Sequence, residues 1–400
     1  MVLFTGKGGV GKTSIAAASA VSAARRGARV LVTSTDAAHS LADAFATPLG
    51  DRPAPVTLAG IELHAQQLDA QRRLEQHWGQ VHAYLTTLLA WGGVGEVLAE
   101  ELVLLPGLEE LFALFDLRAQ VASARYDLVV VDCAPTAETL RLLSLPDALR
   151  FYGDRVLGPS RSLKRAIAPL ARTRGPAGTP VPLPDDQVVD AVSEVHGSLA
   201  AIHALLTDPD RSTVRLVVNP ERLVLAEAAR TTTALSLLGY GIDAVIVNRV
   251  LPDAAVGPYL TRWRQRHREH TASARRLFAP VPVLEVPLLE DEVVGAHALA
   301  HLGELAYGER DPVAVLHRAP PLHVDVEDGK HVLRLALPLA TEDDLSLSRA
   351  GDALQVTVGA VRRNVPLPAA LRRRRVEGAR LRDGVLEVRF VADVVPAARE

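Results

Sequence analysis

The chain has 400 residues, more than one ordinary hydrophobic core accommodates, so we expect a main domain with a smaller one appended. Its residues are 48% hydrophobic and 23% charged, and its formal net charge of -3 excludes a field strong enough to gather nucleic acid or acidic lipid. The single cysteine, Cys133, excludes an internal disulfide and indicates a reducing compartment. There is no export signal and no apolar stretch of the roughly 18 residues that span a bilayer, so a soluble, cytoplasmic protein is predicted.

Up to about residue 307, short apolar runs rich in valine alternate with longer stretches of helical period. This alternation predicts an α/β fold, a doubly wound and mostly parallel sheet covered by helices on both faces. The predicted strands are 2–5, 29–33, 127–132, 214–219, 244–248 and 282–286. The intervals of about 68–124 and 144–206 have helical patterns and are predicted to form a helical subdomain within a first domain of residues 1–310.

From about residue 320 the pattern changes to alternating segments separated by turn dipeptides, which is typical of antiparallel strands. Hairpin turns are predicted at Asp328-Gly329, Gly351-Asp352 and Asp383-Gly384. Residues 322–392 are therefore expected to form a small all-β sandwich. Residues 311–321, which contain three prolines, are expected to form the linker before it.

A phosphate-binding loop motif follows the first predicted strand and opens an alanine-rich helix that is predicted to stop at Gly27. Its glycines let backbone N–H groups curl around phosphate oxygens, and the helix N-terminus adds its positive end. Lys12 is expected to reach the outer phosphates and the Thr13 hydroxyl to ligate magnesium, so ATP and Mg²⁺ are the predicted cofactors. A glycine-rich turn without a ligand is the alternative. The predicted binding residues are Gly6, Lys7, Gly8, Gly9, Val10, Gly11, Lys12, Thr13 and Ser14.

Lys7 is not required by an ordinary phosphate loop, and Lys7 to Thr13 resembles the deviant Walker A loop of one class of ATPases. That class includes the ArsA arsenite-pump ATPases, the tail-anchored-protein targeting ATPases, partition ATPases and the nitrogenase iron protein. The resemblance implies a homodimer in which Lys7 crosses to the partner's nucleotide and, with Lys12, stabilises the transferring phosphoryl group. A solvated loop lysine is the alternative.

Asp36-Ala-Ala-His-Ser-Leu41 follows the second predicted strand and resembles the first switch of the ArsA and targeting branch. The resemblance implies that Asp36 orients or deprotonates the attacking water. An aspartate at a strand end is otherwise often a helix cap. Because Ala37 replaces the proline of the family pattern, the stiffness of this switch is not carried over.

Asp132-Cys-Ala-Pro-Thr136 ends the third predicted strand and resembles the second switch of the same branch. The resemblance implies that Asp132 holds the outer shell of magnesium, with Thr13 as the direct ligand. A structural aspartate at the end of a parallel strand is the alternative. Ala137 and Glu138 replace the Gly-His of the family pattern, so the amplitude of the switch movement is also not carried over.

Three later segments match the branch at the expected ligand edge of the sheet. The resemblance implies that Glu221 contacts nucleotide, often across the dimer, and that Asn248 recognises adenine. It also implies that the loop 287–294, with Pro287 and Leu288, closes over the base. Each of these residues is equally consistent with an ordinary turn.

The β tail, from Leu322 to Phe390, resembles the α-crystallin domain of small heat-shock proteins, which some ArsA-like ATPases carry; a generic β-sandwich is the alternative. The paired cysteines that clamp a zinc across some targeting dimers are missing from residues 251–270, so no structural zinc is expected. His267 and His270 could form a metal pair, but solvent-facing helix residues are the favoured interpretation.

The favoured function is a homodimeric, magnesium-dependent ATPase whose nucleotide state opens and closes a site for a hydrophobic client, such as a membrane-protein helix. By analogy with the targeting ATPases, a transient membrane receptor is a further expected partner. The helical intervals suit an apolar client groove because they are rich in Leu, Ala and Val. The alternatives are a metalloid-anion transport subunit, which the single thiol disfavours, and a nucleotide-dependent scaffold whose β tail binds partners.

Overall fold

The computed structural model describes residues 1–36, 40–58, 60–68, 108–144, 186–318, 321–338, 340–359 and 361–392. Within them, eight strands form one sheet in the order β3-β4-β2-β5-β1-β6-β7-β8. The strands are β1 (Val2–Thr5), β2 (Val30–Ser34), β3 (Ala54–Leu58), β4 (Ile61–Gln67), β5 (Leu128–Asp132), β6 (Thr213–Val218), β7 (Ile242–Val250) and β8 (Val283–Pro287). All neighbours pair in parallel except β3 and β4, which confirms the predicted doubly wound sheet.

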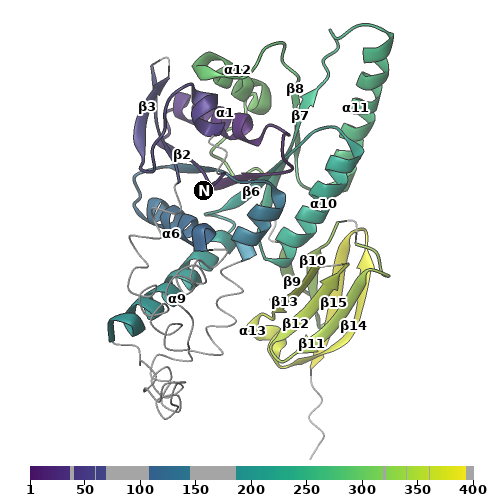
Figure 1. Cartoon of the computed structure of the whole chain (residues 1–400). Helices are drawn as coiled ribbons and strands as arrows, with labels where there is room; N and C mark the ends of the chain where they lie inside the picture. Colours follow the sequence, from purple (N-terminus) through teal and green to yellow (C-terminus); the bar gives the residue numbers. More distant parts are fainter. Residues whose placement is uncertain are drawn as a thin grey trace, which may run out of the picture.

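Helices cover both faces of this sheet (Figure 1). On one face lie α1 (Lys12–Arg25) and α12 (Gly295–Tyr307), with the short α2 (Ser40–Phe45) beside them. The other face carries α6 (Leu108–Ala122), α9 (Asp186–Thr207), α10 (Arg222–Leu237) and α11 (Pro258–Leu277). Because both faces are covered, the inner strands β1, β2, β5 and β6 are buried at every residue, which explains their uninterrupted apolar runs.

The alanines of α1 allow α12 to pack unusually close to it. Ala16, Ala17, Ala18, Ala20 and Ala23 are buried, and a Cβ placed on Gly303 of α12 would lie 2.8 Å from the Ala18 carbonyl oxygen. The two helices therefore meet almost backbone to backbone. At its end, α1 passes into Gly27 at φ 90, close to the predicted stop.

The edge hairpin formed by β3 and β4 was not among the predicted strands. Pro55 and the mostly exposed side chains of β3 weaken its strand pattern, yet an edge strand tolerates both because one side of it needs no ladder partner. β4 lacks the valine-rich run of the inner strands. Composition alone did not distinguish this hairpin from a loop.

The predicted helical intervals are described only at their ends. α6 occupies the end of the first interval and α9 most of the described end of the second, and the two helices contact each other. Arg118 of α6 donates a hydrogen bond of 3.1 Å to the Ser198 hydroxyl of α9. Residues 69–107 and 145–185 lie outside the described part of the chain.

The tail forms a β-sandwich of a four-stranded sheet, β14-β15-β10-β9, and a three-stranded sheet, β11-β12-β13. Its elements are β9 (Leu322–Glu327), β10 (Lys330–Ala336), β11 (Leu345–Ala350), β12 (Ala353–Val358), β13 (Val361–Pro366), α13 (Ala369–Arg372), β14 (Arg374–Arg382) and β15 (Val385–Ala392). All three predicted hairpin turns are confirmed. Asp328 and Gly329 have φ of 50 and 75, and Asp383 and Gly384 of 48 and 73, as tight turns with two left-handed residues require.

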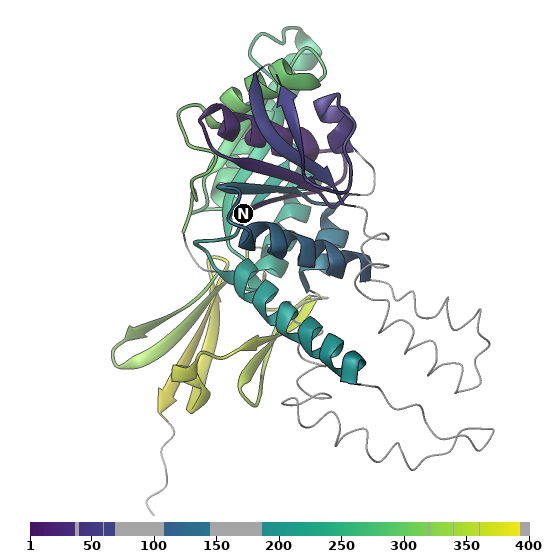
Figure 2. The same ribbon diagram turned by 90° about the vertical axis from the view of Figure 1, so that its left-hand side faces the viewer.

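The sandwich is attached to the main domain through α10. Leu237, at the end of that helix, is part of the sandwich's own hydrophobic core, and the Thr233 hydroxyl donates a 2.8 Å hydrogen bond to the Pro338 carbonyl. Figure 2 shows the sandwich and α9 extending from the same side of the main sheet.

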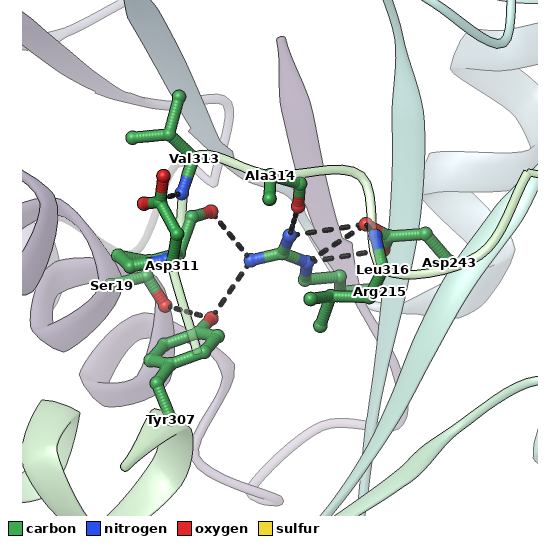
Figure 3. Close-up of polar contacts among 9 residues, drawn as sticks. Ser19, Arg215, Asp243, Tyr307, Asp311, Val313, Ala314 and Leu316 are labelled. Carbon is green, nitrogen blue, oxygen red and sulfur yellow. Dashed lines mark hydrogen bonds and ion pairs between the residues drawn. The ribbon is translucent and has the colours of Figure 1, made fainter. Parts of the chain in front are cut away.

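A buried ion pair holds the segment that leads from the main domain to the sandwich (Figure 3). Arg215 of β6 and Asp243 of β7 are both fully buried and pair at 3.1 Å. The guanidinium also donates to the carbonyls of Pro312 and Ala314 at 3.0 and 2.9 Å, and Asp243 accepts the Leu316 N–H at 3.1 Å. The first part of the predicted linker is thus bound across the ends of two core strands.

Candidate functional site

The predicted site residues come together because they follow strands that run in the same direction. β1, β2, β5, β6, β7 and β8 are parallel, so their carboxyl ends lie along one edge of the sheet. The phosphate loop leaves β1 at this edge, Asp36 follows β2, Asp132 ends β5 and Glu221 follows β6. Asn248 lies near the end of β7, and Leu288 follows β8.

The phosphate loop has the backbone that its sequence requires. Gly6, Gly9 and Gly11 have φ of 152, 81 and 92, which side-chain-bearing residues rarely adopt. A Cβ on Gly6 would lie 2.2 Å from the Val217 carbonyl oxygen, and one on Gly11 would lie 2.4 Å from the Asn248 amide nitrogen. The loop therefore admits only glycine at both positions, and its N–H groups can approach a ligand closely.

Lys12, Thr13 and Asp132 form the buried side of the site. The Lys12 side chain starts the first turn of α1 and is 6% exposed, while its ammonium lies 3.4 Å from the Lys7 carbonyl. The Thr13 hydroxyl lies 3.1 Å from the Ser40 hydroxyl of α2, so the loop already touches the end of the first switch. Ser34, at the end of β2, donates to one oxygen of Asp132 at 3.5 Å.

Asp132 is a buried acid whose carboxylate can still accept a hydrogen bond. Its Oδ1 atom has no hydrogen-bond partner among the described residues, and the residue is fully buried. Burial raises the pKa of Asp132 to about 6; the Thr13 hydroxyl and the Lys12 ammonium oppose this rise, and the negative charge of Asp36 adds to it. A free carboxylate oxygen beside a threonine hydroxyl and a lysine suits a hydrated divalent cation.

Asp36 lies at the start of the first switch. Its backbone N–H donates to the Ser34 hydroxyl at 3.1 Å, which fixes the turn out of β2 next to Asp132. The next three residues of the switch, 37–39, lie outside the described part of the chain. Asp36 therefore lies close to Asp132, and its action on the attacking water stays a prediction.

Lys7 differs from Lys12 in being half exposed and in having an acidic neighbour. Its ammonium pairs with Glu227 of α10 at 3.6 Å, and the two side chains are 47% and 31% exposed. Glu227 was not predicted, because it lies one and a half turns inside a helix, six residues after Glu221, where no motif marks it. Glu221 itself is exposed, and its carbonyl accepts the Leu225 N–H in the first turn of α10.

Two residues near the end of β7, Asn248 and Arg249, contact the phosphate loop. The Asn248 amide donates to the Val10 carbonyl at 2.9 Å, and its oxygen accepts the Arg249 N–H at 2.9 Å. Arg249, which was not predicted, has φ 58 and donates to the Gly9 carbonyl at 3.0 Å. Leu288 is 42% exposed, and its N–H binds the Val250 carbonyl, so the loop after Pro287 begins beside Asn248.

Comparison with known proteins identifies the family. Residues 1–308 match the ArsA ATPase family model, described as an anion-transporting ATPase. The chain is an ATPase of the ArsA family. Residues 328–390 match the HSP20-like domain found in ArsA proteins, which confirms the small heat-shock-protein resemblance of the sandwich.

Relatives of this ArsA-family chain include proteins named as arsenical pump-driving ATPases and a protein named GET3. "Putative arsenical pump-driving ATPase 1" of Aquifex aeolicus is 35% identical over 389 residues, 95% of this chain and 97% of that protein. A "Putative arsenical pump-driving ATPase" of Chlorobaculum tepidum is 36% identical over 372 residues, 93% of this chain and 91% of that protein. "ATPase GET3" of Phaeosphaeria nodorum is 27% identical over 299 residues, 74% of this chain and 90% of that protein.

The ArsA-family site contains no ready-made metal cage in the part of the chain that the structure describes. Across the described residues no cluster of three or more His, Cys, Asp or Glu side chains is placed to hold a metal. His267 instead accepts the Leu251 N–H at 3.1 Å, and burial together with the nearby His270 lowers its pKa. None of the described helices is long and apolar enough to cross a bilayer.

Proposed function

We propose that this ArsA-family ATPase works as a homodimer, with ATP and Mg²⁺, and that nucleotide-driven closure of the dimer controls binding of a hydrophobic client. The observation that carries the proposal is the contrast between its two loop lysines. Lys12 is buried against the cradle, whereas Lys7 is half exposed on the same edge. The buried Lys12 can contact only the nucleotide bound to its own subunit, whereas the half-exposed Lys7 can reach a nucleotide bound to a partner subunit.

Within one subunit, the backbone of Gly6 to Thr13 would hold the phosphates, and Lys12 would neutralise their charge. Thr13 and Asp132 would hold Mg²⁺, directly and through water respectively. When bound, the cation neutralises the developing negative charge of phosphoryl transfer. Asp36 would orient the attacking water, which its position after β2, close enough to influence the pKa of Asp132, supports.

Across the dimer, Lys7 would leave Glu227 and approach the phosphates of the partner subunit. The ion pair that it leaves is exposed and thus weak, about 0–1 kcal/mol, so release costs little. In the closed and water-poor interface, a lysine at the transferring phosphoryl group gains far more than it does in solvent. Glu221 and the loop after Pro287 would contact the nucleotide from the same edge.

Mixing two inactive variants tests this arrangement. Lys7→Ala and Asp36→Asn should each abolish most ATP hydrolysis as homodimers. In a heterodimer, the Lys7→Ala subunit keeps its own Asp36 and receives Lys7 from its partner. Random mixing should restore roughly a quarter of the wild-type rate, because half of the dimers are heterodimers with one intact site each. Two inactive variants that stay inactive when mixed, after proven subunit exchange, would show that Lys7 does not act in trans.

A membrane-protein helix is the client that we propose, by analogy with the relative named GET3. The support from this chain is the apolar composition of its helical intervals. Capture of a soluble peptide with a single apolar helix, in the presence and absence of Mg²⁺ and ATP, tests this step. Binding that does not change with nucleotide would rule out the proposed coupling.

Stimulation by a metalloid anion is a second candidate, favoured by the names of two relatives at 35% and 36% identity. Its difficulty is chemical, because trivalent arsenic binds thiolates and this chain has only Cys133. That thiol is buried, and burial strongly raises its pKa, so it stays protonated. An ATPase rate that is unchanged by arsenite would remove this candidate.

A further inference from the structure

Strand β7 is irregular where it passes the phosphate loop. Its register with β8 shifts between Val247 and Val250. Two residues of β7, Asn248 and Arg249, lie there opposite a single residue of β8. A bulge of this kind turns side chains out of the regular alternation of a strand, and bulges are frequent beside active sites. Here both side chains are directed to the phosphate loop.

Arg249 has a backbone conformation that its residue type disfavours. Its φ of 58 lies in the left-handed region, which glycine and asparagine adopt far more readily than arginine does. The Asn248 side-chain oxygen holds this conformation by accepting the Arg249 N–H at 2.9 Å. Strained backbone persists where the surrounding contacts impose it, and it clusters at functional sites. The arginine at this position therefore indicates that its side chain has a role that glycine could not fill.

The Arg249 side chain acts on the phosphate loop. Its guanidinium donates to the Gly9 carbonyl at 3.0 Å and has no other partner among the residues that the structure describes. Beside it, the Asn248 amide donates to the Val10 carbonyl at 2.9 Å. Two consecutive carbonyls of the loop are thus held by two consecutive residues of β7.

Holding these carbonyls fixes the direction of two N–H groups. In a trans peptide, the C=O of one residue and the N–H of the next point in opposite directions. The bond from Arg249 to Gly9 therefore turns the Val10 N–H away from β7. The bond from Asn248 to Val10 does the same for the Gly11 N–H. Within the described chain neither N–H has an acceptor, so both can donate to a ligand.

We propose that Arg249 is a positioning residue for ATP hydrolysis: by holding the Gly9 carbonyl, it aims the Val10 N–H at the phosphates of the nucleotide. The N–H groups of a phosphate loop donate to phosphate oxygens, and these bonds are strong because the acceptor is charged. The inference rests on the proposed binding of ATP at Gly6 to Thr13. It requires neither a partner subunit nor a free surface, because each of its contacts lies within one chain.

Replacing Arg249 with glycine separates this role from a purely structural one. Glycine adopts φ 58 without strain, so Arg249→Gly deletes the guanidinium and leaves the backbone in a conformation that suits the new residue. The unfolding temperature should stay within about 3 °C of the wild type, because only one exposed hydrogen bond is lost. A side chain that merely supports the fold would instead lower it well beyond that range.

Binding of ADP and of adenosine gives the decisive readout, by isothermal titration of the full-length protein. Arg249→Gly should bind ADP roughly tenfold more weakly, the order of one hydrogen bond to a charged group. Its affinity for adenosine, which has no phosphate, should be unchanged. In ATP hydrolysis the KM should rise by a similar factor while kcat stays within about twofold, because the Val10 N–H contacts phosphate both before and during the reaction.

Rescue by the conservative variant is a second readout. The ammonium of Arg249→Lys can donate to the same carbonyl, so its affinity for ADP should return to within about threefold of the wild type. The matched backbone control is Ala124→Gly. Ala124 has φ 52 in the turn between α6 and β5, at the sheet edge opposite the phosphate loop. This substitution relieves the same kind of strain and should leave ADP binding and ATP hydrolysis unchanged.

Lys12→Ala distinguishes failure of this inference from failure of the proposed site. If Lys12→Ala binds ADP as the wild type does, the phosphate site and the role of Arg249 are both wrong. If Lys12→Ala loses ADP while Arg249→Gly keeps full affinity, only the role of Arg249 is refuted. Equal losses of ADP and adenosine affinity, or a lysine variant as weak as the glycine variant, would also overturn the assignment.

Discussion

At the scale of single residues, the two loop lysines have opposite surroundings although they are only five residues apart. Lys12 is held inside the cradle, while Lys7 is half exposed and rests on Glu227. The ion pair with Glu227 holds the Lys7 ammonium on its own subunit. If Lys7 acts on the partner's nucleotide as proposed, the strength of this pair sets how readily Lys7 leaves it.

Glu227→Gln should tighten the nucleotide-dependent dimer, because Lys7 no longer has a carboxylate to leave. The free energy of unfolding should change by less than about 1 kcal/mol, since the pair is exposed. Sedimentation with Mg²⁺ and a non-hydrolysable nucleotide measures the dimer. Glu304→Gln, which removes the carboxylate from the exposed pair with Arg25, is the control and should have no effect. Dimers of unchanged affinity would show that Glu227 does not restrain Lys7.

Asp132→Asn should stabilise the nucleotide-free protein near neutral pH while abolishing ATP hydrolysis. The folded state raises the pKa of Asp132 from 3.8 to about 6, so the stability gained from the protonated carboxyl is complete below pH 4 and is lost as pH rises through 6. The variant should thus exceed the wild type by about 2–3 kcal/mol at pH 7 and match it near pH 4. Urea unfolding at both pH values checks this. The same difference at both would contradict a buried ionised acid.

At this scale, some site residues could be predicted from the sequence and others could not. The phosphate loop and both switch aspartates could be placed because each follows a predicted strand, and strand ends share one edge. Arg249 and Glu227 were missed, since their roles depend on contacts between segments more than two hundred residues apart. Arg215 and Asp243 were missed for a different reason, because a charged residue inside an apolar run gives no sign of which partner satisfies it.

At the scale of elements, α10 links the nucleotide edge to the sandwich. It starts beside Glu221, carries Glu227 one and a half turns inside the helix, and ends at the sandwich with Thr233 and Leu237. A rotation of this helix would therefore move residues both at the nucleotide edge and in the core of the sandwich. The hairpin signals predicted the strands of the sandwich well, yet nothing in the sequence indicated that Leu237 belongs to its core.

Arg215→Met should destabilise the chain by about 3–5 kcal/mol, because Asp243 would remain as a buried charge without its partner. It should also expose residues 311–318 to proteolysis, since two of their carbonyls lose their donor. Arg215→Met/Asp243→Leu should recover much of the loss. Urea unfolding provides the measurement, and Arg318→Met, which breaks only an exposed pair with Asp210, is the control at under about 1 kcal/mol. Equal effects of the two arginines would contradict the buried role.

At the scale of the whole molecule, the nucleotide edge and the sandwich lie at different ends of α10, so ATP hydrolysis and the role of the sandwich can be tested separately. The predicted order of a parallel sheet followed by an all-β tail agrees with the structure. Its β3–β4 edge does not follow from composition, because an exposed edge strand with a proline resembles a loop.

A chain ending at Arg318 should keep ATP hydrolysis, because all the described contacts of the phosphate loop lie before that residue. Client capture by this truncated chain decides between the groove in the helical intervals and a scaffold role of the sandwich. Retained capture supports the groove. If all capture is lost while hydrolysis continues, the sandwich is the binding unit.

The close packing of α1 and α12 limits how the site can close. α1 begins in the phosphate cradle and α12 begins where the base-side loop ends, and Gly303 leaves no gap between the two helices. We therefore expect α1 and α12 to move together as one rigid unit. If the loop 287–294 closes over the base as the family resemblance implies, Gly295, at φ 78, stands at the junction where that loop meets α12. The distance between the phosphate loop and the start of α12 would then stay fixed, which favours ligands with one distance between phosphate and base.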